Sequence, residues 1–104
     1  MKEETIKRIR KFSSDRDWDK YHTPNALAKT IAIEATELLE CFQWNENGNI
    51  NKIKEELADV IVNCQNLIDK LNLDIDEVVN EKMDQNEKKY PVEKFKGIAK
   101  KYNE

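Results

Sequence analysis

The segment that decides the fold runs from residue 34 to residue 59. It reads Glu34-Ala35-Thr36-Glu37, then a spacer of eighteen residues, then Glu56-Leu57-Ala58-Asp59. Each pair of acids is three residues apart, and on a helix this spacing places both side chains on one face. If two such helices pack side by side, the four carboxylates converge, and converging like charges need a cation. Carboxylate oxygens suit Mg²⁺ or Mn²⁺ better than zinc or copper, so the pattern predicts an acidic metal site across two helices.

The composition around this segment predicts an all-α protein. Hydrophobic and charged residues each make up 38% of the 104 residues, and two Gly and two Pro leave little material for the turns of a β fold. The apolar residues are periodic, which favours a helical domain over disorder. We expect a single domain over residues 1–104, with a four-helix-bundle-type core over about residues 3–91. A core of this size would be completed by self-association.

Charge and hydropathy exclude several classes of function. The net charge is −3 and acids and bases are interspersed, so no basic stripe indicates nucleic-acid binding. No apolar run is long enough to span a membrane, and no signal peptide is recognisable at the N-terminus. Cys41 and Cys64 lie among apolar residues, where buried free thiols are common. These features predict a cytoplasmic protein without disulfides.

Local signals place four helices and a tail. Thr23 is a good N-cap and Pro24 suits a first helical position. Asp74, with Glu77 three residues later, resembles a capping box. The expected helices cover about residues 2–15, 24–42, 51–71 and 74–90, with an Asn-rich loop at 44–51. Residues 92–104 are expected to form a short helix or a tail.

The position of the acids on these helices is informative. Glu34 lies at the edge of the apolar arc of its helix, and Glu56 borders the arc of the next helix, with Asp59 slightly further round. One Glu-x-x-Glu pair alone is usually a solvated face, but two pairs that border apolar arcs favour a metal site. The only histidine, His22, lies in a loop, which argues against a di-iron site built on Glu-x-x-His.

Two other groups of residues carry chemistry. Lys82 and Asn86 lie near the centre of the apolar arc of the fourth helix, where they need polar partners such as a phosphate or a base. Trp18, His22 and Trp44 flank the second helix. Such tryptophans are often core residues, and a lone histidine near a helix start is often a capping residue; the functional alternative is a stacking pocket for a nucleobase.

In sequence, these motifs resemble the MazG-like, all-α nucleoside triphosphate pyrophosphohydrolases, and most closely their dCTP pyrophosphatase branch. The family pattern Glu-x-x-Glu, spacer, Glu-x-x-Asp falls on Glu34, Glu37, Glu56 and Asp59. The further matches are Arg16-Asp17-Trp18, His22-x-Pro24, Glu37-Leu38-x-Glu40-x-Phe42-Gln43-Trp44, Glu55-Glu56-Leu57-Ala58-Asp59-Val60 and Lys82-Met83-Asp84-x-Asn86-x-x-x-Tyr90-Pro91. The similarity covers residues 12–91.

The resemblance implies Mg²⁺-dependent hydrolysis of (deoxy)nucleoside triphosphates to monophosphate and pyrophosphate, with Mn²⁺ as a possible substitute ion. Glu34, Glu37, Glu56 and Asp59 would hold the metal, and Glu34 or Glu37 would activate the water. The residues implied to contact the nucleotide are Trp18, His22, Trp44 and Asn86 for base and sugar, and Lys82 and Tyr90 for phosphate or closure.

The resemblance also implies partners and a biological role. Members of the family assemble as dimers or as dimers of dimers that share the site between subunits. The expected role is house-cleaning of the nucleotide pool, with a preference for dCTP or modified pyrimidine nucleotides. The alternative from another class is a non-catalytic helical interaction module derived from this fold. Retention of all four acids together with Lys82 and Asn86 favours the enzyme.

Overall fold

A computed structural model describes all of residues 1–104 as helices joined by loops, with no strand. The α-helices are α1 (Glu3–Asp15), α2 (Pro24–Glu40), α3 (Ile50–Lys70), α4 (Ile75–Lys89) and α5 (Val92–Phe95), and a short 3₁₀ helix, η1, spans Asp19–Tyr21. The chain divides into two compact units, residues 1–72 and residues 73–104, which are described separately. No helix is both long and apolar enough to cross a membrane.

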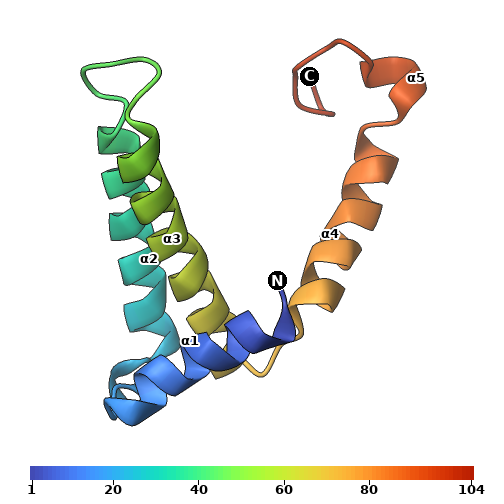
Figure 1. The fold of residues 1–104 in the computed structure, drawn as a ribbon. Coiled ribbons are helices and arrows are strands. Elements are labelled where there is room, and N and C mark those ends of the chain that lie inside the picture. The colour runs from blue at the N-terminus through green and yellow to red at the C-terminus, as the bar shows by residue number, and fades with distance from the viewer. The chain divides into compact units, whose positions relative to one another are not determined.

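The first unit is built on a hairpin of two long helices. α2 and α3 run antiparallel, joined by the loop at residues 41–49, and α1 lies across the opposite end of this hairpin, against α3 (Figure 1). Because α2 and α3 are neighbours along most of their length, the two acidic pairs of the sequence are carried on adjacent helices.

Side-chain caps fix where the long helices begin. The Thr23 hydroxyl accepts a hydrogen bond from the backbone N–H of Ala26 at 3.1 Å, as expected for an N-cap before Pro24. Asn49 caps α3 in the same manner, and Asp74 caps α4 by accepting from the N–H of Glu77 at 3.1 Å. The predicted helix starts and ends therefore agree with the structure to within a few residues.

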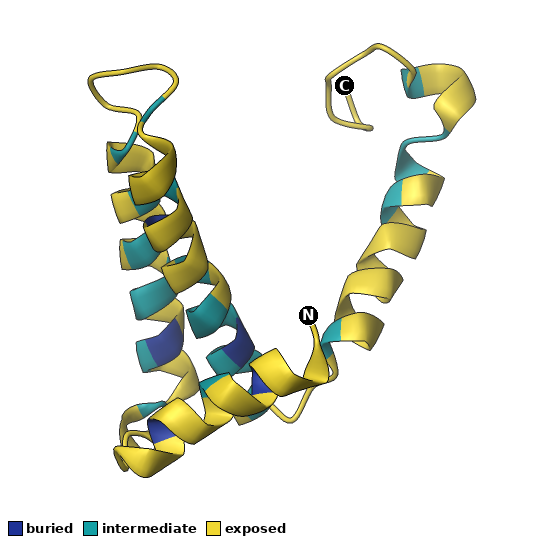
Figure 2. Cartoon of the chain, viewed as in Figure 1, coloured by how far each residue is buried: buried dark blue, intermediate teal, exposed yellow.

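The buried core of the first unit is small. Only Ile6 and Leu27 are buried apolar residues, and the other buried side chains are polar: Ser13, Glu56 and Gln65 (Figure 2). The apolar periodicity of α1 and α2 predicts inward positions for Phe12 and Leu39, and this prediction is wrong, because the two residues are 49% and 70% exposed. A periodic arc gives the direction of a side chain but not whether another element covers it, and one neighbouring helix covers only part of a broad arc.

A polar network attaches α1 to α3. Arg10 donates two hydrogen bonds to the Asp69 carboxylate, at 3.0 and 2.9 Å, and Gln65 Nε2 donates to the same carboxylate at 3.1 Å. The Arg10 pKa is raised, chiefly by the hydrogen bond with Asp69. Such a two-point contact fixes orientation as well as distance, so it defines how α1 lies on the hairpin.

The second unit consists of α4, α5 and the chain that follows. α4 buries no residue, and Val78, Val79 and Met83 on its apolar arc are 38%, 51% and 47% exposed. At its C-terminal end the Tyr90 ring packs edge-on against Phe95 and Tyr102, with ring centroids 5.0 and 5.9 Å apart. The prediction of an all-α fold is thus confirmed. A single domain over residues 1–104 and completion of the core by a second copy stay predictions.

Candidate functional site

Three of the four acids of the motif meet between α2 and α3. Glu34 on α2 and Glu56 and Asp59 on α3 each offer a carboxylate oxygen, and these three oxygens lie within 4.8 Å of one another. Glu56 is buried, Glu34 is half-buried and Asp59 is exposed, so the cluster extends from the packed interface to solvent. This is the convergence that the two three-residue spacings predict.

Two oxygens of this cluster are buried without a partner. Glu34 Oε2 and Glu56 Oε2 make no hydrogen bond. Burying a carboxylate oxygen without a donor is costly, and a native site normally satisfies it. A divalent cation would satisfy both atoms at once, and a set of carboxylates alone suits a hard ion such as Mg²⁺. The residues present therefore fit a metal.

The fourth acid, Glu37, is exposed and lies beside the same cluster. The pKa of Glu37 is raised above its usual value, first by a side-chain hydrogen bond with Glu34 and by the charge of Glu34, and further by desolvation and by Glu56. Like charges in contact disfavour ionisation of all of them together. Glu37 thus lies within electrostatic reach of Glu34 and Glu56, and a bound cation would relieve the repulsion among these carboxylates.

Lys52 contacts this cluster, and its role was not predicted from the sequence. Its Nζ lies 3.1 Å from Glu56 Oε1 and 3.8 Å from Glu55 Oε2, and the pKa of Lys52 is raised, chiefly by its hydrogen bond with Glu56. Lys52 precedes Glu56 by four residues, and this i, i+4 spacing on a helix could have indicated the pair. Lys52 balances part of the negative charge.

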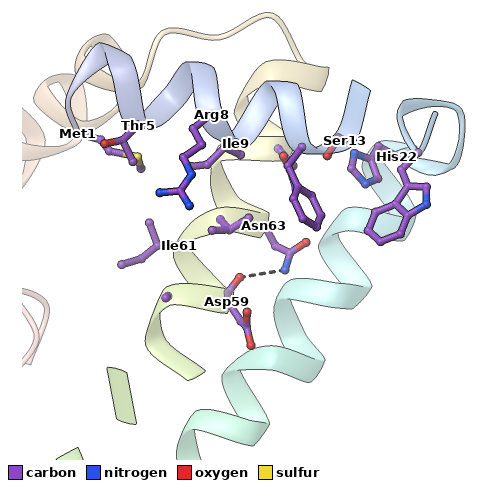
Figure 3. A pocket seen from close by; sticks show the side chains of 14 residues that line it. Met1, Thr5, Arg8, Ile9, Ser13, His22, Asp59, Ile61 and Asn63 are labelled. Carbon is purple, nitrogen blue, oxygen red and sulfur yellow. Dashed lines mark hydrogen bonds between the residues drawn. The ribbon is translucent and has the colours of Figure 1, made fainter. Parts of the chain in front are cut away.

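A pocket of about 680 Å³ opens between α1 and α3, next to the acidic cluster (Figure 3). Asp59 lines it, and so do Trp18 and His22. The prediction grouped Trp18 and His22 as contacts of a base, and the structure brings both to one pocket adjoining a motif acid. The His22 side chain is 19% exposed, and its Nδ1 lies 4.0 Å from the Asp19 carboxylate.

An aromatic contact holds Trp18 in place. The Phe12 and Trp18 rings meet edge-on with centroids 5.6 Å apart, and the Arg16 guanidinium lies 3.8 Å above the Phe12 ring. Arg16 also donates a hydrogen bond to the backbone oxygen of Phe12 at 3.1 Å. Periodicity alone predicts Phe12 on the inner face of α1. Its contact with Trp18 depends on a backbone turn in which Asp17 has φ of 54°, which no periodic pattern indicates.

The other predicted contacts lie elsewhere in the chain. Trp44 follows α2 in the 41–49 loop and is 90% exposed, whereas Trp18 and His22 precede α2. A helix of seventeen residues is about 25 Å long, so one chain does not bring Trp44 to the pocket. The remaining three predicted contacts belong to the second unit: Lys82 is exposed, and Asn86 and Tyr90 are half-buried.

The chain is all-helical and carries two acidic pairs on neighbouring helices. Comparison with known proteins shows the family to which such a chain belongs. A sequence model of the MazG-like family matches residues 29–104. The chain belongs to the MazG-like family.

Two relatives named dCTP pyrophosphatase 1 are similar to this chain over 112 aligned residues. The rat protein is 32% identical and the human protein 31% identical, and both alignments cover 97% of this chain. The chain spans 66% of the length of these relatives. A solved pyrophosphatase from Archaeoglobus fulgidus is 40% identical, with a TM-score of 0.79, covering 86% of this chain and 91% of its own.

Proposed function

We propose that this protein is a Mg²⁺-dependent nucleoside triphosphate pyrophosphohydrolase that converts a (deoxy)nucleoside triphosphate and water into the monophosphate and pyrophosphate. The observation that carries the proposal is the cluster of Glu34, Glu56 and Asp59 with two buried, unpartnered oxygens. The relatives are named as pyrophosphatases, and these names support the same activity.

Glu34, Glu37, Glu56 and Asp59 would hold the metal. When bound, Mg²⁺ neutralises phosphate oxygens and orients the triphosphate for in-line attack. Glu34 and Glu56 provide the buried part of the site, and Asp59 provides the part that adjoins the pocket. This division favours a substrate whose phosphates face the metal held by the carboxylates and whose base lies in the pocket.

Glu37 is our candidate for the general base, because it is the exposed member of the first pair and lies beside Glu34. It would take a proton from the attacking water as the water oxygen forms a bond to the α-phosphorus. The bond between the α-phosphorus and the bridging oxygen breaks, and this oxygen leaves with pyrophosphate. Lys52, already 3.1 Å from Glu56, would keep that carboxylate oriented.

The proposed base pocket includes Trp18 and His22, with dCTP or a modified pyrimidine nucleotide as the favoured substrate. Trp44 would reach a nucleotide only from a second copy of the chain, which agrees with the proposal of a homo-oligomer, a dimer or a dimer of dimers. Lys82 and Tyr90 would contact phosphate or close the site, and Asn86 would contact the base or sugar.

The test is pyrophosphate release from a panel of triphosphates with Mg²⁺, using the wild type, Glu37→Gln and Glu40→Gln. Glu40 is the matched control, an exposed glutamate on the same helix that is absent from the carboxylate cluster. We expect release by the wild type and by Glu40→Gln, and loss in Glu37→Gln and on chelation. No release from any triphosphate by the folded wild type would reject the enzyme and favour an interaction module.

A further inference from the structure

The pocket between α1 and α3 has an apolar wall and a few polar groups. Ile9 from α1 and Ile61 and Val62 from α3 contribute apolar surface. Asn63 and Asn66 on α3 are the amide side chains that line it. A pocket of this kind binds through its apolar area and selects its ligand through its few polar groups. Which bases it accepts therefore depends on what these amides present to the ligand.

The amide of Asn63 is held in one orientation. Its Nδ2 donates a hydrogen bond to the backbone oxygen of Asp59 at 2.9 Å. A backbone oxygen can only accept, so the amino half of the amide must face Asp59. The Oδ1 of Asn63 is left on the opposite side, toward the part of the pocket where Ser13 and His22 lie (Figure 3). The amide atom of this half-buried side chain that faces this part of the pocket is therefore the acceptor Oδ1.

Arg8 and the Trp18 indole N–H can only donate and the Asp59 carboxylate can only accept, whereas two other polar groups of the pocket can present either character. Asn66 makes no side-chain hydrogen bond and its amide can turn to present either half. His22 can donate or accept, depending on its tautomer. Asn63 is therefore the uncharged acceptor of this pocket whose orientation a hydrogen bond sets before a ligand arrives.

We propose that Asn63 determines base specificity, with its Oδ1 accepting a hydrogen bond from the exocyclic amino group of a base such as cytosine. A base with a carbonyl at that position, such as uracil, would place two acceptors against each other. This inference rests on the proposed function and names the substrate class that the site selects. Asp59 and Asn63 are one helical turn apart, about 6 Å along α3, so a nucleotide can reach both the carboxylates and the amide.

The test compares dCTP with dUTP, which have the same sugar and phosphates and differ at the base edge. kcat/KM for both is measured at equal Mg²⁺ in the wild type, Asn63→Leu, Asn63→Ser and the control Asn51→Leu, at an exposed asparagine of α3 that does not line the pocket. Leucine has a similar size and no acceptor. Serine can still bond the backbone oxygen four residues earlier, but it withdraws the amide oxygen from the pocket. Circular dichroism confirms that each variant is folded.

We expect the wild type to prefer dCTP, and both Asn63 variants to lose about tenfold in kcat/KM for dCTP, while dUTP changes by no more than about threefold. Asn51→Leu should keep the wild-type ratio. An unchanged ratio in the folded Asn63 variants, a wild-type preference for dUTP, or an equal loss of the ratio in Asn51→Leu would overturn the assignment while leaving the pyrophosphohydrolase intact. No release from any triphosphate by the wild type would reject the proposed function, and the inference with it.

Discussion

α3 and α4 are both amphipathic helices with a side-chain cap at the N-terminus, yet they are packed very differently. α3 buries Glu56 and Gln65 against its neighbours, whereas α4 buries no residue and leaves Val79 half in solvent. α3 packs against both α1 and α2. Within residues 73–104, α4 is contacted by α5 and the C-terminal segment only at its C-terminal end.

The carboxylate cluster is therefore contained in residues 1–72 of one chain. On α3, packing against α2 holds the carboxylates in a fixed relation to one another. On α4, the proposed contacts Lys82, Asn86 and Tyr90 would need a surface from outside residues 73–104 to form a site with the carboxylates. Four measurements test this contrast.

The largest effect is expected from Glu56→Gln on α3. This change removes a charged ligand from the buried part of the cluster, and we expect kcat for pyrophosphate release to fall by at least about 100-fold. Mg²⁺ binding, measured by titration calorimetry, should weaken in parallel. Glu55→Gln is the matched control, since Glu55 is 71% exposed, and it should stay within about twofold of the wild type. Equal losses in both variants would contradict a specific role for Glu56.

The second effect concerns stability in the packed unit. Leu27 is 3% exposed, and Leu27→Ala should lower the free energy of unfolding by about 2 to 5 kcal/mol through lost burial and the cavity left behind. Urea unfolding followed by circular dichroism measures it. A loss below about 1 kcal/mol would mean that the first unit is packed less tightly than its burial indicates.

The third effect tests whether α4 takes part in the site. Lys82→Ala should raise KM for the triphosphate about tenfold, about 1.4 kcal/mol, because a cationic partner of phosphate is lost. The melting temperature should not change, since Lys82 is exposed. The control is Lys88→Ala on the same helix. If Lys82→Ala behaves like this control, Lys82 does not contact the substrate.

The smallest effect is expected on the apolar face of α4. Val79→Ala, at a side chain 51% exposed, should change the free energy of unfolding by no more than about 0.5 kcal/mol in dilute protein. Thermal unfolding at two protein concentrations is the measurement. A larger loss that grows with concentration would show that a second copy covers this face, which is the oligomer proposed above.

Much of the local structure was predictable because its causes are local. Thr23 before Pro24, and Asp74 three residues before Glu77, indicated helix starts that the structure reproduces. The three-residue spacing of the acids likewise predicted which side chains share a helix face. The 3₁₀ turn at Asp19–Tyr21 was not predicted, because it follows Asp17 in a left-handed conformation that the neighbouring residue types do not demand.

The helical class, the helix limits and the carboxylates that can share a face could be predicted from the sequence, since each depends on contacts within a few residues. Three other features required the packed structure: that Glu34, Glu56 and Asp59 meet, that two of their oxygens are buried without partners, and that the Asn63 oxygen faces a pocket. The reason is that burial and convergence depend on which helix lies beside which, and a periodic pattern gives the direction of a side chain but not its partner.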